Sequence, residues 1–98
     1  MPTYKAPLRD LRFVYNELFN PAELQNLPGF EEVTPDLVEA ILEEAGKFCE
    51  NVLLPINRSG DEIGVRFDNG QVITPPGLKE AYQAYSENGW GALTADPE

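Results

Sequence analysis

A long amphipathic stretch between two prolines, residues 35–54, constrains the fold of this chain more than any other feature. Its apolar residues recur at spacings of three and four and so share one helix face; they are Leu37, Val38, Ile41, Leu42, Ala45, Phe48, Cys49, Val52 and Leu53. Thr34 is a candidate N-cap, and Pro35 suits the first helical position. Pro55 is expected to end the run. The pattern predicts a helix about 30 Å long whose apolar face needs a packing partner.

Two shorter helices are predicted on either side of the long one. The first spans residues 8–19, and its shared apolar face consists of Leu8, Leu11, Tyr15, Leu18 and Phe19. Asn20-Pro21 should end it, because a proline ring disfavours a helical residue before it. The other spans residues 77–88, with an apolar stripe of Leu78, Ala81, Tyr82 and Tyr85. Asn88-Gly89 offers that helix a left-handed C-terminal cap.

A β-hairpin is predicted between the long helix and the last one. Val65–Asp68 and Gln71–Thr74 flank Asn69-Gly70, a pair that readily adopts the positive φ values of a type I′ turn. Residues 21–33 are expected to connect the first two helices, with one turn at 22–26, and the chain from 56 to the hairpin should be irregular. The predicted fold class is mainly α, with three helices (about 8–19, 35–54 and 77–88) and a short β-hairpin near 65–74.

Composition excludes several classes of function. The 98 residues hold 7 Lys and Arg against 17 Asp and Glu, a net charge of −10 that opposes binding to nucleic acid or to an anionic membrane surface. One cysteine, Cys49, permits no intrachain disulfide. No signal peptide and no apolar run long enough to span a membrane are evident, so a cytoplasmic protein is expected. Histidine, the commonest general base and metal ligand, is absent.

For each residue that could carry out chemistry, a structural role is favoured over a catalytic one. Glu39, Glu43 and Glu44 fall on the polar face of the long helix, where water keeps carboxylates ionised, so a solvated face is favoured over an acid–base pair. Cys49 lies on the apolar stripe with no histidine to activate it. Ser59 and Ser86 lack a partner base as well.

Neither a calcium loop nor a phosphate-binding loop can be read from the sequence. Asp68-Asn69-Gly70 fails as a calcium loop, because the aligned ligand positions fall on Val65 and Phe67. The glycines and arginines at Gly60, Gly64, Arg58 and Arg66 match no phosphate-loop motif. No catalytic, cofactor-binding or metal-binding residue is therefore predicted in this chain.

Four stretches nevertheless resemble the acyl-CoA dehydrogenase family. Residues 44–61, EAGKFCENVLLPINRSGD, look like the first long helix and its exit in that family. Residues 77–85, GLKEAYQAY, and 88–98, NGWGALTADPE, are similar to the following helix and loop. Residues 4–13, YKAPLRDLRF, resemble the extra N-terminal element of the large bacterial subgroup. Members of that subgroup act on fatty acyl-CoA and methylmercaptopropionyl-CoA, and the resemblance covers nearly the whole chain.

The resemblance implies an N-terminal extension with one helix over residues 1–33. Over 34–98 it implies the first part of the family's N-terminal helical domain, truncated, since relatives continue past Asp-Pro-Glu with a glycine-rich loop. Such a parent enzyme oxidises acyl-CoA to 2-enoyl-CoA, with α-proton abstraction by a glutamate and hydride transfer to FAD, and electron-transferring flavoprotein is its usual acceptor. The β domain, the base and the flavin site of the family have no counterpart in this sequence.

The chain alone is therefore expected to bind no FAD and to be inactive, packing against the remaining domains of the same enzyme and closing the acyl pocket. For Tyr82, Tyr85 and Trp90, ordinary packing of the last helix is favoured over a wall of that pocket. The alternative is a stand-alone acidic helical protein-interaction module that binds a partner through the 35–54 stripe. Either form could self-associate through exposed apolar helix faces. A small enzyme with a novel site is the weakest hypothesis.

Overall fold

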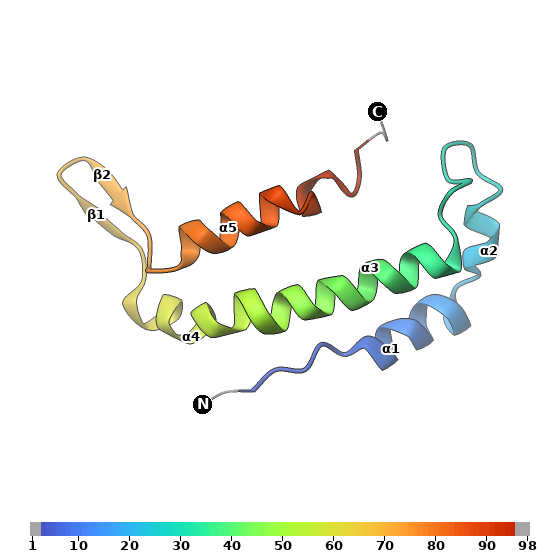
Figure 1. Cartoon of the computed structure of the whole chain (residues 1–98), viewed down its shortest axis with the longest axis horizontal. Coiled ribbons are helices and arrows are strands. Elements are labelled where there is room, and N and C mark those ends of the chain that lie inside the picture. The colour runs from blue at the N-terminus through green and yellow to red at the C-terminus, as the bar shows by residue number, and fades with distance from the viewer. Residues whose placement is uncertain (1–2, 96–98) are drawn as a thin grey trace. The chain divides into compact units, whose positions relative to one another are not determined.

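The computed structural model describes residues 3–95 and divides into two compact units, residues 3–51 and 52–95. Its helices are α1 (Leu8–Phe13), α2 (Pro21–Leu24), α3 (Pro35–Phe48), α4 (Leu54–Ile63) and α5 (Leu78–Glu87), and its strands are β1 (Arg66–Asp68) and β2 (Gln71–Ile73) (Figure 1). Two π-helical segments, η1 (Val14–Leu18) and η2 (Cys49–Leu53), and a 3₁₀ turn, η3 (Trp90–Ala92), complete the helical parts. The predicted class, mainly α with one hairpin, is confirmed.

In the first unit, α1 and η1 together make the predicted first helix. The helical backbone ends at Leu18, and Phe19 and Asn20 are extended before Pro21, as the restriction on a residue that precedes proline requires. Pro21 then begins α2 at the first helical position, which suits its fixed φ. This short helix provides the single turn that was expected between the first two helices. α1 lies alongside α3 within the unit (Figure 1).

α3 begins as its sequence predicts. The Thr34 hydroxyl oxygen accepts a hydrogen bond from the Leu37 amide at 3.2 Å, which satisfies one of the unpaired donors of the first turn. Pro35 occupies the first turn, where its missing N–H costs nothing. Asp36 places a negative charge at the same end, where it is favoured by the helix dipole.

The prediction that Pro55 ends the long helix is wrong. Helical backbone continues through η2 into α4 and ends at Ile63, so residues 56–63, which were expected to be irregular, are helical. The π-helical bonding in η2 skips one more residue than α-helical bonding and shifts the hydrogen-bond register just before the proline. Pro55 then stands in the first turn of α4, where no backbone donor is needed. Gly64, with φ 72°, ends α4 instead.

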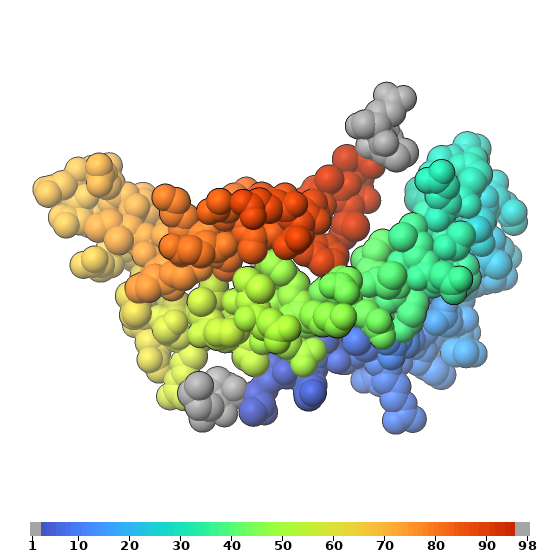
Figure 2. Space-filling view, in the orientation of Figure 1, coloured from blue at the N-terminus to red at the C-terminus, as the bar shows by residue number. Residues whose placement is uncertain are grey.

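In the second unit, the hairpin forms with the predicted turn. β1 and β2 pair antiparallel, with Phe67 opposite Val72 and Asp68 opposite Gln71. Asn69 and Gly70 have φ values of 51° and 76°, the positive values that a type I′ turn requires. In Figure 2 the hairpin projects from the helical part of its unit, with its atoms uncovered on the face in view.

α5 also matches its prediction. Asn88 caps its C-terminal end, where the side-chain amide donates to the Ala84 carbonyl at 2.8 Å. Gly89 follows in the left-handed conformation with φ 77°, which is the usual way for a helix to end. Ala81, on the predicted apolar stripe, is 5% exposed.

The apolar surface of the described chain is mostly uncovered. Within residues 3–95, the buried positions are Gly46, Pro75 and Ala81, and the apolar stripe predicted along 35–54 is half-buried or exposed throughout. Monomeric soluble proteins rarely leave large contiguous apolar patches exposed, so such surfaces commonly mark interaction sites. No helix in the described part of the chain combines the length and the apolar character needed to cross a membrane.

Candidate functional site

An ion pair between α1 and α3 is the most developed polar arrangement in the first unit. The Arg12 Nε donates to Glu39 Oε2 at 2.9 Å, and its Nη2 pairs with Glu39 Oε1, so the contact is bidentate. The same Nη2 lies 3.6 Å from Glu43 Oε1. Both carboxylates stay half-exposed, as a polar helix face implies, but the sequence did not indicate that they share Arg12, which is 27 residues from Glu39. Glu44 pairs with Lys47 at 3.1 Å, three residues along the same helix.

The hydrogen bond to Glu39 raises the pKa of Arg12 above its ordinary value. Desolvation opposes this rise, and the charges of Glu39 and Glu43 add to it. A raised pKa means that the pairing stabilises the fold fully below the pKa of the unfolded state. That stability is lost only as the pH rises through the folded-state value. Because arginine is charged throughout the physiological range, its own titration gives this contact no pH dependence near neutrality.

Arg12→Gln should loosen α1 from α3 without unfolding the unit. The pair is partly exposed, so we expect a small effect: faster hydrogen exchange of the α1 amides, by an amount that shrinks as salt is added. Exchange measured by mass spectrometry at low and high salt checks this. Arg58→Gln is the matched control, because Arg58 pairs with Glu62 inside α4 at 2.9 Å and should leave α1 unaffected. Equal exchange in the Arg12 variant and the unaltered chain would contradict the assignment.

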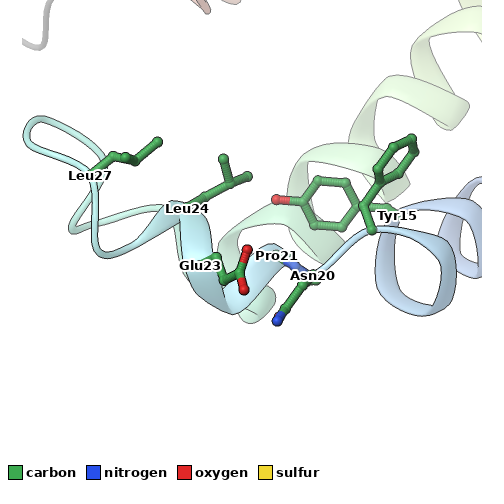
Figure 3. Close-up of a pocket in the computed structure, with 7 residues that line it drawn as sticks. Tyr15, Asn20, Pro21, Glu23, Leu24 and Leu27 are labelled. Atoms are coloured by element: carbon green, nitrogen blue, oxygen red, sulfur yellow. The ribbon is translucent and has the colours of Figure 1, made fainter.

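A shallow hollow lies between η1 and α2. It has a volume of about 440 Å³, and its lining residues, mostly apolar, are Tyr15, Phe19, Asn20, Pro21, Glu23, Leu24 and Leu27 (Figure 3). Tyr15 extends its ring toward Leu24, and Glu23 is the one carboxylate of the lining. The mostly apolar lining makes the hollow a surface for apolar contact.

The other residues considered as candidates for chemistry lie in helices or in the hairpin. Cys49 is a half-buried free cysteine in η2. The Ser59 hydroxyl donates to the Ile56 carbonyl at 3.4 Å, a bond within its own helix. Asp68 is the last residue of β1, and Asn69 and Gly70 form the hairpin turn that follows it. Over residues 3–95, no cluster of three or more His, Cys, Asp or Glu side chains is placed to hold a metal ion.

Two aromatic residues of α5, Tyr82 and Tyr85, lie close together. Their rings stack with centroids 6.3 Å apart, and a Cβ built at Gly91 would lie 3.6 Å from the Tyr85 ring carbon Cε1. Tyr82 is 68% exposed, so the far side of this pair is open. The stacked pair supplies an aromatic surface on α5.

Comparisons with known proteins bear on the chain as a whole. No protein-family model matches the sequence. The chain is 36% identical over 96 residues to the 3-methylmercaptopropionyl-CoA dehydrogenase of Ruegeria pomeroyi, a match that covers 98% of this chain. It is also 31% and 29% identical, over 97 residues each, to two butyryl-CoA dehydrogenases of Syntrophomonas wolfei, across 95% of this chain. The chain therefore belongs to the acyl-CoA dehydrogenase family, and it spans 16% of the length of each of these relatives.

Proposed function

We propose that this chain serves as the N-terminal helical part of an FAD-dependent acyl-CoA dehydrogenase and has no activity by itself. One observation carries the proposal: 98% of the chain matches a curated dehydrogenase of which it spans only 16%. The relatives are named for methylmercaptopropionyl-CoA and butyryl-CoA, so an acyl-CoA thioester is the proposed substrate class. The proposed parent oxidises it to a 2-enoyl-CoA in the cytoplasm and passes electrons to electron-transferring flavoprotein.

The residues of this chain fit a packing role better than a cofactor role. The large uncovered apolar residues fit a segment that is completed by further polypeptide. In the proposed enzyme these faces pack against the remaining domains and help close the acyl pocket, which excludes water from the reacting bond.

A chimera tests the proposal. Residues 1–98 replace the matching segment of the Ruegeria pomeroyi enzyme, and a second variant lacks that segment entirely. We expect the chimera to purify with bound flavin and to oxidise the acyl-CoA of the host enzyme, whereas the deletion variant should lose flavin. The isolated 98-residue chain should show no visible flavin absorbance after incubation with FAD.

Two outcomes would contradict the proposal. An isolated chain that binds FAD stoichiometrically and oxidises an acyl-CoA would show that the active parts are present after all. A chimera without flavin, beside an unaltered host enzyme that retains it, would show that the segment cannot replace its counterpart. That second result would favour the stand-alone interaction module.

A further inference from the structure

The β-hairpin carries an apolar face that nothing in its own unit covers. Phe67 and Val72 are directly opposite each other across the two strands, so their side chains share one face of the hairpin. They are 76% and 67% exposed, and Val65, next to β1, is 62% exposed. We call Phe67 and Val72 the hairpin face. Neither residue is covered by α4 or α5, the helices that flank the hairpin in the chain.

A hairpin of this size needs a surface to lie on. Each strand has three residues, and no residue of either strand is buried. Two-stranded hairpins are marginally stable in water, and they persist when an apolar face packs against a helix or sheet. The type I′ turn fixes the register, so the sequence specifies which two side chains share the uncovered face.

We propose that the hairpin face docks on an apolar surface of the enzyme polypeptide that lies outside this segment. This inference rests on the proposed function and names the contact by which the segment is held. The length of the relatives supports this occupant: the chain spans 16% of each, so most of each relative lies outside the matched segment. A second copy of this chain fits less well, because each copy carries a net charge of −10 and association would bring like charges together.

The experiment compares hydrogen exchange of the hairpin in two settings. In the isolated 98-residue chain, the amides of residues 66–73 should exchange rapidly, since both strands are exposed. In the chimera with the Ruegeria pomeroyi enzyme they should exchange at least about tenfold more slowly, because docking excludes water from the hairpin. Protection that appears in the isolated chain as its concentration rises would overturn the inference and identify a second copy as the occupant.

A pair of substitutions locates the contact on one face. Phe67→Lys and Gln71→Lys add the same charge to the same hairpin, but Gln71 lies opposite Asp68 on the other face. We expect Phe67→Lys to lower the melting temperature of the chimera and to restore rapid hairpin exchange, while Gln71→Lys leaves both unchanged. Phe67→Leu keeps an apolar side chain and should retain most of the protection.

The failure of this inference differs from the failure of the proposed function. If the chimera with an unaltered hairpin lacks flavin and activity, the proposed function is wrong and the docking contact falls with it. If that chimera is active, but its hairpin amides exchange as fast as in the isolated chain, the docking contact alone is wrong. Equal effects of Phe67→Lys and Gln71→Lys in an active chimera would also overturn the docking contact.

Discussion

Gly77→Ala is expected to destabilise the second unit by about 2–4 kcal/mol, a large effect for one added methyl group. Two causes combine. Gly77 has φ 88°, in the left-handed region where an alanine is strained. A Cβ built at this position would also lie 2.8 Å from Ile56 Cγ2, closer than non-bonded carbon atoms approach. The backbone on which α5 begins must therefore move away from α4.

The measurement is urea unfolding followed by tryptophan fluorescence. Trp90 is the single tryptophan of the chain and lies in the same unit, just beyond α5, so its signal reports on this region. Gly89→Ala is the matched control: its φ is 77°, but no atom lies within 4 Å of the added carbon. We expect the control to cost only the backbone strain, about 1–2 kcal/mol.

A double-variant cycle separates the two causes. Ile56→Ala removes the Cγ2 that the new methyl group would meet, so the doubly substituted chain should lose less stability than the sum of the single losses. Additive losses, or a Gly77→Ala cost no larger than that of Gly89→Ala, would show that the crowding against Ile56 is not felt. Gly77 follows Pro75 and Pro76, which connect β2 to α5, so a shift at Gly77 would also change how the hairpin is joined to α5.

Local chemistry explains which parts of the fold the sequence could predict. The start of α3 follows from Thr34 and Pro35, and the hairpin follows from Asn69-Gly70, because each signal acts within a few residues of itself. Pro21 and Pro55 show the limit of such reasoning. Both prolines restrict the residue before them, yet at Pro55 a π-helical segment shifts the hydrogen bonds and the helix continues.

The sequence patterns did not predict contacts between residues that are distant in the chain. Arg12 meets Glu39 across 27 residues, and Gly77 meets Ile56 across the hairpin, although neither pair has a spacing that marks it. The functional assignment shows the same limit. Apolar faces such as Phe67 with Val72 carry no catalytic signature, so the family could be inferred from resemblance but not from chemistry-bearing residues. The predicted boundary between residues 33 and 34 stays a prediction. The division of the chain at residues 51 and 52 describes two compact units and does not test that boundary.

The second large effect is expected at Gly46, where α3 meets the N-terminal segment. Gly46 is buried, and a Cβ built there would lie 3.2 Å from the Ala6 Cβ and 3.4 Å from both Leu8 methyl carbons. Gly46→Leu adds three further carbons to a space that barely admits one. We therefore expect a loss of about 1–3 kcal/mol from overpacking. It should appear as faster hydrogen exchange of the amides in α1 and η1.

Gly46→Ala and Gly60→Ala show whether the space at Gly46 decides the result. Alanine favours a helix over glycine by up to about 1 kcal/mol, so at Gly60, where no atom lies within 4 Å of the new carbon, the substitution should stabilise α4. At Gly46 the same gain is opposed by the contact with Ala6, and we expect little net change. A Gly46→Leu chain whose α1 amides exchange as slowly as in the unaltered chain would show that α1 does not need this close approach.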